Sequence, residues 1–159
     1  MRLAALPGLA AAALALATAS AASPAPSRTI LVTSITVKSV SHDIGPKGPS
    51  AGDTVVYADR LVNAAAQFGK GKGERVGADR GTALIVASQG AVLHGTTTLP
   101  GGTLTISGPI TPLANGGLTV AVTKGTGAFA HMRGTLIVGP GKTRALNTYR
   151  LTRASSRVA

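Results

Sequence analysis

The sequence predicts an all-β protein whose single domain is an eight-stranded antiparallel closed β-barrel, preceded by a signal peptide. From Thr29 onward β-branched residues dominate, and Gly or Pro recurs every eight to fifteen residues, as it does between short strands. Outside the amino terminus no segment keeps an apolar period of 3.6 residues over three turns, so helices are not expected. Short turns between successive strands imply antiparallel pairing, because parallel pairs need long crossovers. Eight such strands form a sandwich or a closed barrel, and closure removes exposed strand edges.

The amino terminus has the layout of a secretory signal peptide. Arg2 is followed by an uncharged run rich in Ala and Leu, and then by small-residue cleavage sites at 17–19 and 19–21. A membrane anchor is the alternative, since about 18 apolar residues are a candidate span. The run contains Pro7 and Gly8 and ends in cleavable sequence, which favours the signal. We expect a signal peptide at 1–21, export to the periplasm or the extracellular space, and no transmembrane anchor after cleavage.

The rest of the chain divides into a leader, one domain and a short tail. Residues 22–28 are rich in Ser, Pro and Ala and are expected to be a flexible leader. The barrel domain is expected at 29–153 and the tail at 154–159. The expected strands are 29–41, 53–63, 81–88, 91–98, 102–108, 117–123, 133–138 and 143–152, with a further short strand at 73–77.

Composition limits the chemistry and the partners of this domain. The chain has no Cys, which excludes disulfides and thiolate metal sites. It carries 16 Lys and Arg against 5 Asp and Glu, and loss of Arg2 with the signal leaves a net charge of +10. Such a charge favours anionic partners or simply solubility. The four aromatic residues are not interleaved with the basic ones, so nucleic-acid binding is not expected.

The stretch "GTGAFA" (125–130) matches a loose dinucleotide-binding fingerprint, but its surroundings do not. That fingerprint needs a following helix, whose N-terminus binds phosphate, and an acid about twenty residues later. Here strand-forming residues follow, and no Asp or Glu occurs after Asp79. We therefore interpret Gly125, Gly127 and Gly134 as structural glycines of a corner between strands, with positive φ at Gly125 or Gly127 and no helix after them.

Five stretches of the sequence form a recognisable series. They are "GDTVVYADRL" (52–61), "GERVGADRGTALIVAS" (73–88), "LPGGTLTISGP" (99–109), "VTKGTGAFAHMRG" (122–134) and "NTYRLT" (147–152). In this order and spacing the series resembles the dirigent and allene oxide cyclase superfamily, over roughly residues 30–152. The resemblance implies an eight-stranded barrel with an apolar cavity that takes a small hydrophobic molecule. It also implies a homo-oligomer, a trimer or a dimer.

Asp59 is the first candidate for catalysis. Alternation places Val55, Tyr57, Asp59 and Leu61 on one face of their strand. If that face lines the cavity, burial raises the pKa of Asp59 and suits it to proton transfer beside Tyr57. The matching position is an acid in dirigent proteins and an Asn in allene oxide cyclases. The alternative is a rim acid that pairs with a basic residue. Two cavity acids would favour catalysis over pure binding, and Asp59 is the only one expected.

Four further residues are candidates for the site. Arg133 matches the Arg of the family's Ala-Arg-Gly motif and could bind a carboxylate or phenolate, or else hold the glycine corner through backbone carbonyls. Tyr149 could offer a hydroxyl to a ligand or fill the end of the barrel. Asn147, on the same face of the closing strand, and Phe129, the aromatic residue of the signature, are expected to contact the ligand.

Other chemistry is not indicated. The three histidines lack a recognisable ligand spacing, no Ser nucleophile motif occurs, and we expect neither a metal site nor a cofactor. The family's specific activities do not transfer. Ala128 stands where dirigent proteins often have an acid, and Ala58-Asp59 stands where they have two acids in a row. The expected strand 29–41 lacks the Glu that allene oxide cyclases have on their first strand.

The expected function is that of an exported barrel that needs no cofactor and binds a small hydrophobic molecule. It would guide the isomerisation, cyclisation or stereoselective coupling of that molecule by holding it in one conformer. Whether it is an enzyme stays open; if so, it is an isomerase or cyclase of the allene oxide cyclase type. The alternatives are a non-catalytic ligand-binding barrel and a basic secreted protein that adheres to anionic polymers.

Overall fold

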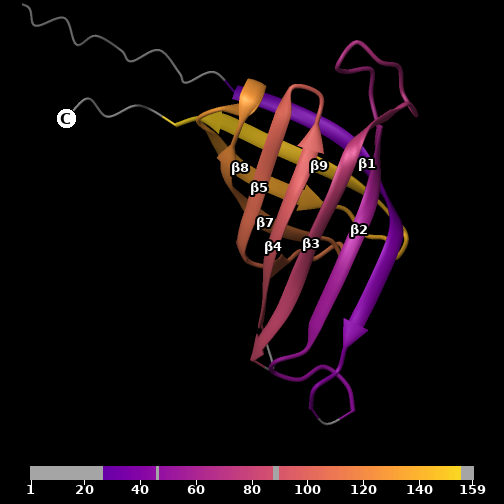
Figure 1. Ribbon diagram of the computed structural model, residues 1–159, viewed down its shortest axis with the longest axis vertical. Coiled ribbons are helices and arrows are strands. Elements are labelled where there is room, and N and C mark those ends of the chain that lie inside the picture. Colours follow the sequence, from indigo (N-terminus) through magenta and orange to yellow (C-terminus); the bar gives the residue numbers. More distant parts are fainter. Residues whose placement is uncertain (1–26, 46, 88–89, 155–159) are drawn as a thin grey trace, which may run out of the picture.

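The computed structural model describes residues 27–45, 47–87 and 90–154. The expected signal peptide lies outside these residues. The regular structure of the described chain is β-strand, apart from one short 3₁₀ helix (Figure 1). The elements are β1 (Ser27–His42), β2 (Thr54–Asn63), β3 (Arg75–Ala87), β4 (Gly90–Leu99), β5 (Gly102–Pro109), β6 (Thr111–Pro112), β7 (Leu118–Gly125), η1 (Gly127–Phe129), β8 (Met132–Val138) and β9 (Arg144–Arg153).

The strands form one closed antiparallel barrel. Their order is β5-β4-β3-β2-β1-β9-β8-β7-β6, and an additional pairing of β5 with β7 closes the sheet on itself. Figure 1 shows β5 to β1 in front and β7 to β9 behind. Eight strands make up the barrel, and the two-residue β6 extends it beside β7. The prediction of an eight-stranded antiparallel barrel is confirmed.

Beyond small shifts at the strand ends, two elements differ from the sequence-based expectation. Residues 73–77 and 81–88 were expected to be separate strands, but the single strand β3 (Arg75–Ala87) covers most of both. It pairs with β2 from Thr54 to Val62, with a register shift between Leu61 and Val62. Gly77, which resembles a turn residue in the sequence, lies inside β3. A glycine is required at this position because the carbonyl of Thr98 approaches it closely. A Cβ on Gly77 would overlap that carbonyl oxygen. The strand β6 was not expected.

Alternation along the strands separates a packed interior from a charged exterior. On β1 the buried residues Ile30, Val32 and Ser34 alternate with residues that are partly accessible. The same pattern on the other strands fills the barrel with aliphatic side chains. The buried apolar core includes Ile30, Val32, Leu61, Val76, Leu93, Leu99, Leu104, Ile106, Val120, Val122, Phe129, Leu136, Tyr149 and Leu151.

One end of the barrel is closed by aromatic side chains. Phe129 of η1 is fully buried, and Phe68, from the loop between β2 and β3, packs against the same core. The guanidinium of Arg28 lies over both rings, 5.3 Å from the centre of Phe68 and 4.9 Å from that of Phe129. Such cation–π contacts stabilise a partly desolvated cation. In Figure 1 η1 and the β2–β3 loop lie at the same, upper end of the barrel.

The corner before β8 differs from the expected one in a single feature. Gly127 has a φ of +57°, as expected for a tight corner. The residues after it form the 3₁₀ turn η1 instead of continuing directly into a strand, with Phe129 N–H donating to Thr126 O and Ala130 N–H to Gly127 O. The prediction that no helix follows the glycines was therefore wrong for this single 3₁₀ turn. β8 begins at Met132, so no α-helix follows the glycines.

The described residues include no helix long and apolar enough to cross a membrane.

Candidate functional site

Two carboxylic acids face each other inside the barrel. Asp59 on β2 pairs directly with Asp79 on β3. In an antiparallel pair, directly opposite residues share a face, with their Cβ atoms about 5 Å apart. Asp79 is 3% exposed and Asp59 is half-buried. The same row of the sheet continues to Thr36 on β1 and to Thr97 on β4, so two hydroxyl-bearing residues flank the acids.

Tyr57 lies one inward position from Asp59 and places its hydroxyl over two glycines. Gly81 and Gly95 pair with each other across β3 and β4. A Cβ on either glycine would lie 2.9 Å from the hydroxyl oxygen of Tyr57. The pair of glycines therefore makes room for this hydroxyl group at the wall of the barrel.

Tyr149 and Asn147 reach the interior from β9. The hydroxyl oxygens of Tyr149 and Thr97 are 3.0 Å apart and hydrogen-bonded, which links the two sides of the barrel through its core. The hydroxyl of Ser34 donates to Ala145 O at 3.4 Å and to Asn147 Oδ1 at 3.5 Å. A polar layer thus crosses an interior that is otherwise aliphatic.

Burial makes Asp79 a much weaker acid than an exposed aspartate. Desolvation is the main cause, since the charged form loses its water, and the charge of Asp59 adds to it. Hydrogen bonds from Thr97 and from the backbone N–H of Arg80 oppose both effects. Together they raise the pKa of Asp79 to about 7. Desolvation also raises the pKa of Asp59, against a hydrogen bond from Thr36.

The two tyrosines are held in their protonated form. Desolvation raises the pKa of Tyr57 and of Tyr149, and the charge of Asp79 raises both further. Their hydroxyl groups therefore remain hydrogen-bond donors throughout the physiological pH range. The Oδ1 atoms of Asp59 and Asp79 are buried without a hydrogen-bond partner among the described residues. An unpartnered buried oxygen costs roughly 1–3 kcal/mol, so a ligand that offers a proton would relieve it.

The structure brings together four of the residues selected from the sequence: Tyr57, Asp59, Asn147 and Tyr149. Arg133 and Phe129 are not among them. Arg133 is exposed on β8, three residues before the buried Leu136, so alternation places it on the outer face of the barrel. This position does not fit the ligand-binding role considered for Arg133 in the interior of the barrel.

Phe129 lies at the closed end. Its ring is fully buried and stacks against Arg28, so it packs the core instead of lining a ligand site. Two of the three glycines interpreted as corner residues also lie elsewhere. Gly125 ends β7 and Gly134 lies inside β8, and in both cases a neighbouring carbonyl leaves no room for a Cβ. Only Gly127 is a corner residue with positive φ.

Asp79 was missed by the sequence analysis. It fell in the gap between the strands expected at 73–77 and 81–88, so no face was assigned to it. In the structure Ala83 packs against the core, and counting back by twos from it puts Asp79 on the same inward face. The expectation of a single cavity acid is therefore corrected to two.

Within the described ranges, no group of three or more His, Cys, Asp or Glu side chains could hold a metal ion.

Comparison with known proteins shows which folds this barrel resembles. No family model and no curated protein sequence matches the chain. Solved structures do match. Pyocyanin demethylase is 25% identical with a TM-score of 0.66, over 79% of this chain and 100% of that one. The chain has a dirigent-like barrel fold. The pterocarpan synthase dirigent protein PsPTS1 is 18% identical with a TM-score of 0.61, over 84% of this chain and 99% of that one.

The dirigent-like barrel fold also occurs in cyclase-type proteins. The Diels-Alderase AbmU from Streptomyces koyangensis is 20% identical with a TM-score of 0.61, over 80% of this chain and 64% of that one. At such identities the likeness concerns the fold, and the chemistry of this dirigent-like barrel has to be argued from its own interior.

Proposed function

We propose that this dirigent-like barrel binds a small, largely apolar molecule in its interior and moves protons on that molecule during isomerisation or cyclisation. The observation that carries the proposal is the opposed pair Asp59 and Asp79, within a layer of polar side chains inside an aliphatic core. Enzymes gain paired acid and base function by separating the pKa values of two titratable groups. The proposed chemistry uses only residues of the chain.

In the proposed reaction one acid donates a proton and the other accepts one. Asp79, with its pKa near neutrality, gives its proton to a carbonyl oxygen of the ligand. Asp59, half-buried and the more easily ionised of the two, accepts a proton from the carbon next to that carbonyl. The ligand becomes an enol, Asp79 becomes a carboxylate and Asp59 becomes protonated. Return of a proton from Asp59 to a different carbon, and of the enol proton to Asp79, yields an isomer and restores both acids.

The tyrosines position the ligand. The hydroxyl groups of Tyr57 and Tyr149 stay protonated and lie near the acids, so each can donate to a ligand oxygen. The aliphatic core around them excludes water, which strengthens such hydrogen bonds. Support also comes from similar folds whose names state a demethylase, a pterocarpan synthase and a Diels-Alderase. Each acts on a small organic molecule.

Deuterium exchange tests the proposal. The protein is incubated in deuterated water with a panel of small cyclic ketones, and NMR follows deuterium entering next to the carbonyl. We expect the wild type to accelerate exchange over Asp59→Asn and Asp79→Asn, each of which retains the shape of the acid. Asp43→Asn, which changes charge equally in the loop after β1, should match the wild type.

Binding is followed in parallel with a neutral naphthylamine fluorophore. A wild type that binds the fluorophore but exchanges no faster than the Asp59→Asn, Asp79→Asn double variant is a non-catalytic binding barrel. That outcome would end the catalytic proposal.

We also propose that the protein works outside the cytoplasm, on the strength of the amino-terminal sequence alone. Mass spectrometry of the exported fraction should find a mature terminus near Ser20–Ser23. A chain that retains Met1 in the membrane fraction contradicts the proposal.

A further inference from the structure

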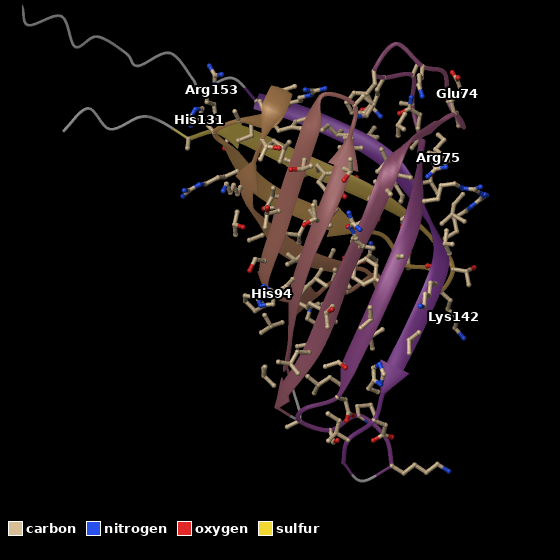
Figure 2. All side chains as sticks on the ribbon, viewed as in Figure 1. Glu74, Arg75, His94, His131, Lys142 and Arg153 are labelled. Carbon is tan, nitrogen blue, oxygen red and sulfur yellow. The ribbon has the colours of Figure 1, made fainter. Side chains whose placement is uncertain are left out.

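The outer wall of the barrel contains a hollow lined by basic side chains. The hollow, of about 650 Å³, spans β9, β1, β2 and the start of β3. Four cationic side chains line it: Arg60, Lys72, Arg75 and Arg144. Figure 2 shows Arg75 and Glu74 at the upper end of this side of the barrel. The volume lies within the roughly 300–1,000 Å³ typical of ligand pockets.

The strand register gathers these charges. On β1 the residue Ile35 pairs with Arg60 of β2 on one side and with Arg144 of β9 on the other. Since neighbouring strands lie about 4.8 Å apart, the two arginines start about 10 Å apart and flank an apolar residue. In the next row Val62 pairs with Arg75. The three guanidinium groups thus rise from one outer face.

The loop that carries Lys72 is held firmly against the wall. The side-chain amide of Asn63 donates to the carbonyls of Gln67, Lys70 and Gly71 at 2.9, 3.0 and 3.2 Å. The backbone N–H of Gly73 donates to Asn63 O at 2.8 Å, and Asn63 N–H donates to Glu74 O at 2.9 Å. These hydrogen bonds hold the backbone of the loop on this side of the hollow.

None of the chain's five acids lines the hollow. Asp59 and Asp79 belong to the barrel interior. The carboxylate of Asp53 accepts hydrogen bonds from Ile44 and Ser50, and that of Glu74 accepts one from the backbone N–H of Gly71. Asp43 follows the far end of β1. Four cations thus face one hollow without a carboxylate in its lining, and their mutual repulsion is relieved by an anionic ligand.

We propose that this hollow binds a short chain of linked phosphate groups. Guanidinium groups bind phosphate oxygens in pairs, and several closely spaced cations suit several closely spaced charges on one ligand. A single carboxylate or orthophosphate would engage only part of the cluster. The site is independent of the acids inside the barrel, so Asp79→Asn should not alter it.

Calorimetric titration with inorganic tripolyphosphate at low ionic strength tests the proposal. The double variant Arg60→Gln, Arg144→Gln should weaken binding by about a hundredfold, roughly tenfold for each guanidinium–phosphate interaction removed. The matched control Arg150→Gln, Arg153→Gln removes the same charge from exposed positions of β9 outside the hollow and should stay close to the wild type. NMR shifts should map to Ile35, Val62 and Gly73.

Four results would overturn the proposal. Undetectable binding at low ionic strength is the first. The second is equal weakening in both double variants, which would indicate a diffuse field of the whole protein. The third is orthophosphate or citrate binding as tightly as tripolyphosphate. The fourth is displacement of tripolyphosphate by an oligogalacturonate at lower concentration, which would assign the hollow to a carboxylate polymer.

Discussion

Asp59 and Asp79 pair side by side on β2 and β3, so that the interior of an aliphatic barrel contains two acids in direct electrostatic contact. Each destabilises the charge of the other, and neither has a basic partner inside the barrel among the residues that the structure describes. Such a pair is costly for folding, which makes its effect measurable in the stability of the protein as well as in its chemistry.

Asp79→Asn should make stability fall less steeply with rising pH between about pH 4 and pH 7, leaving the smaller contribution of Asp59. The folded state raises the pKa of Asp79, so in this window it binds more protons than the unfolded state. Stability of the wild type therefore falls as pH rises, by up to roughly 1.4 kcal/mol per pH unit, and levels off above the folded pKa. Urea unfolding at several pH values checks this. Wild-type stability that increases through the window contradicts the assignment.

Asp59→Asn should lower the pKa of Asp79, because the charge of Asp59 is one of the two effects that raise it. The pKa should remain above its ordinary value of 3.8, since desolvation is the larger cause. Carboxyl-carbon NMR titration measures the shift, with Asp43→Asn as the control. An unchanged pKa would mean that the two carboxyl groups point apart.

Gly95→Ala should cost about 1–3 kcal/mol by overpacking, because the added Cβ would lie 2.9 Å from the Tyr57 hydroxyl oxygen. Tyr57→Phe removes that oxygen. In the Tyr57→Phe background the same change at Gly95 should cost less by roughly 0.5 kcal/mol or more, as for residues in contact. A double-mutant cycle of unfolding free energies decides. Strict additivity would show that the hydroxyl is not seated over the glycines.

Gly127→Ala should destabilise the protein more than Gly116→Ala. Both glycines have positive φ, +57° and +80°, which costs a residue with a Cβ about 1–2 kcal/mol. At Gly127 the new Cβ would also overlap the carbonyl oxygen of Gly101, whereas the nearest atom at Gly116, on Pro140, is 3.9 Å away. Thermal unfolding of both variants compares their losses of stability. Equal losses would show that the carbonyl of Gly101 does not approach Gly127 as closely as described.

Local alternation made part of the site predictable. Tyr57 and Asp59 lie on one strand with Leu61, so their shared face followed from spacing alone. Tyr149 and Asn147 followed in the same way from β9. Asp79 could not be placed, because its face depends on where β3 begins, and the glycines around it suggested turns.

Features that depend on long-range register were beyond the sequence. Arg133 belongs to the signature motif but lies on the outer face of the barrel, as the burial of Leu136 on the opposite face of β8 shows. The cationic hollow draws Arg60, Arg75 and Arg144 from three strands, and only the pairing of β1 with both β2 and β9 brings two of them together around Ile35. Nothing in the spacing of these residues along the chain marks them as neighbours.

The stack of Phe68, Arg28 and Phe129 covers one end of the barrel. Under the proposed function a ligand would reach the acids from the opposite end, where Val55 and Tyr57 on the inward face of β2 are partly accessible. A spent molecule therefore occupies the route of the next one, and its inhibition should be competitive with the incoming substrate. A bulky substituent should be tolerated only on the part of the ligand that faces the open end of the barrel, near Val55 and Tyr57. An affinity resin should accordingly retain the protein when the ligand is tethered by its outer end and lose it when tethered by the end that reaches the acids.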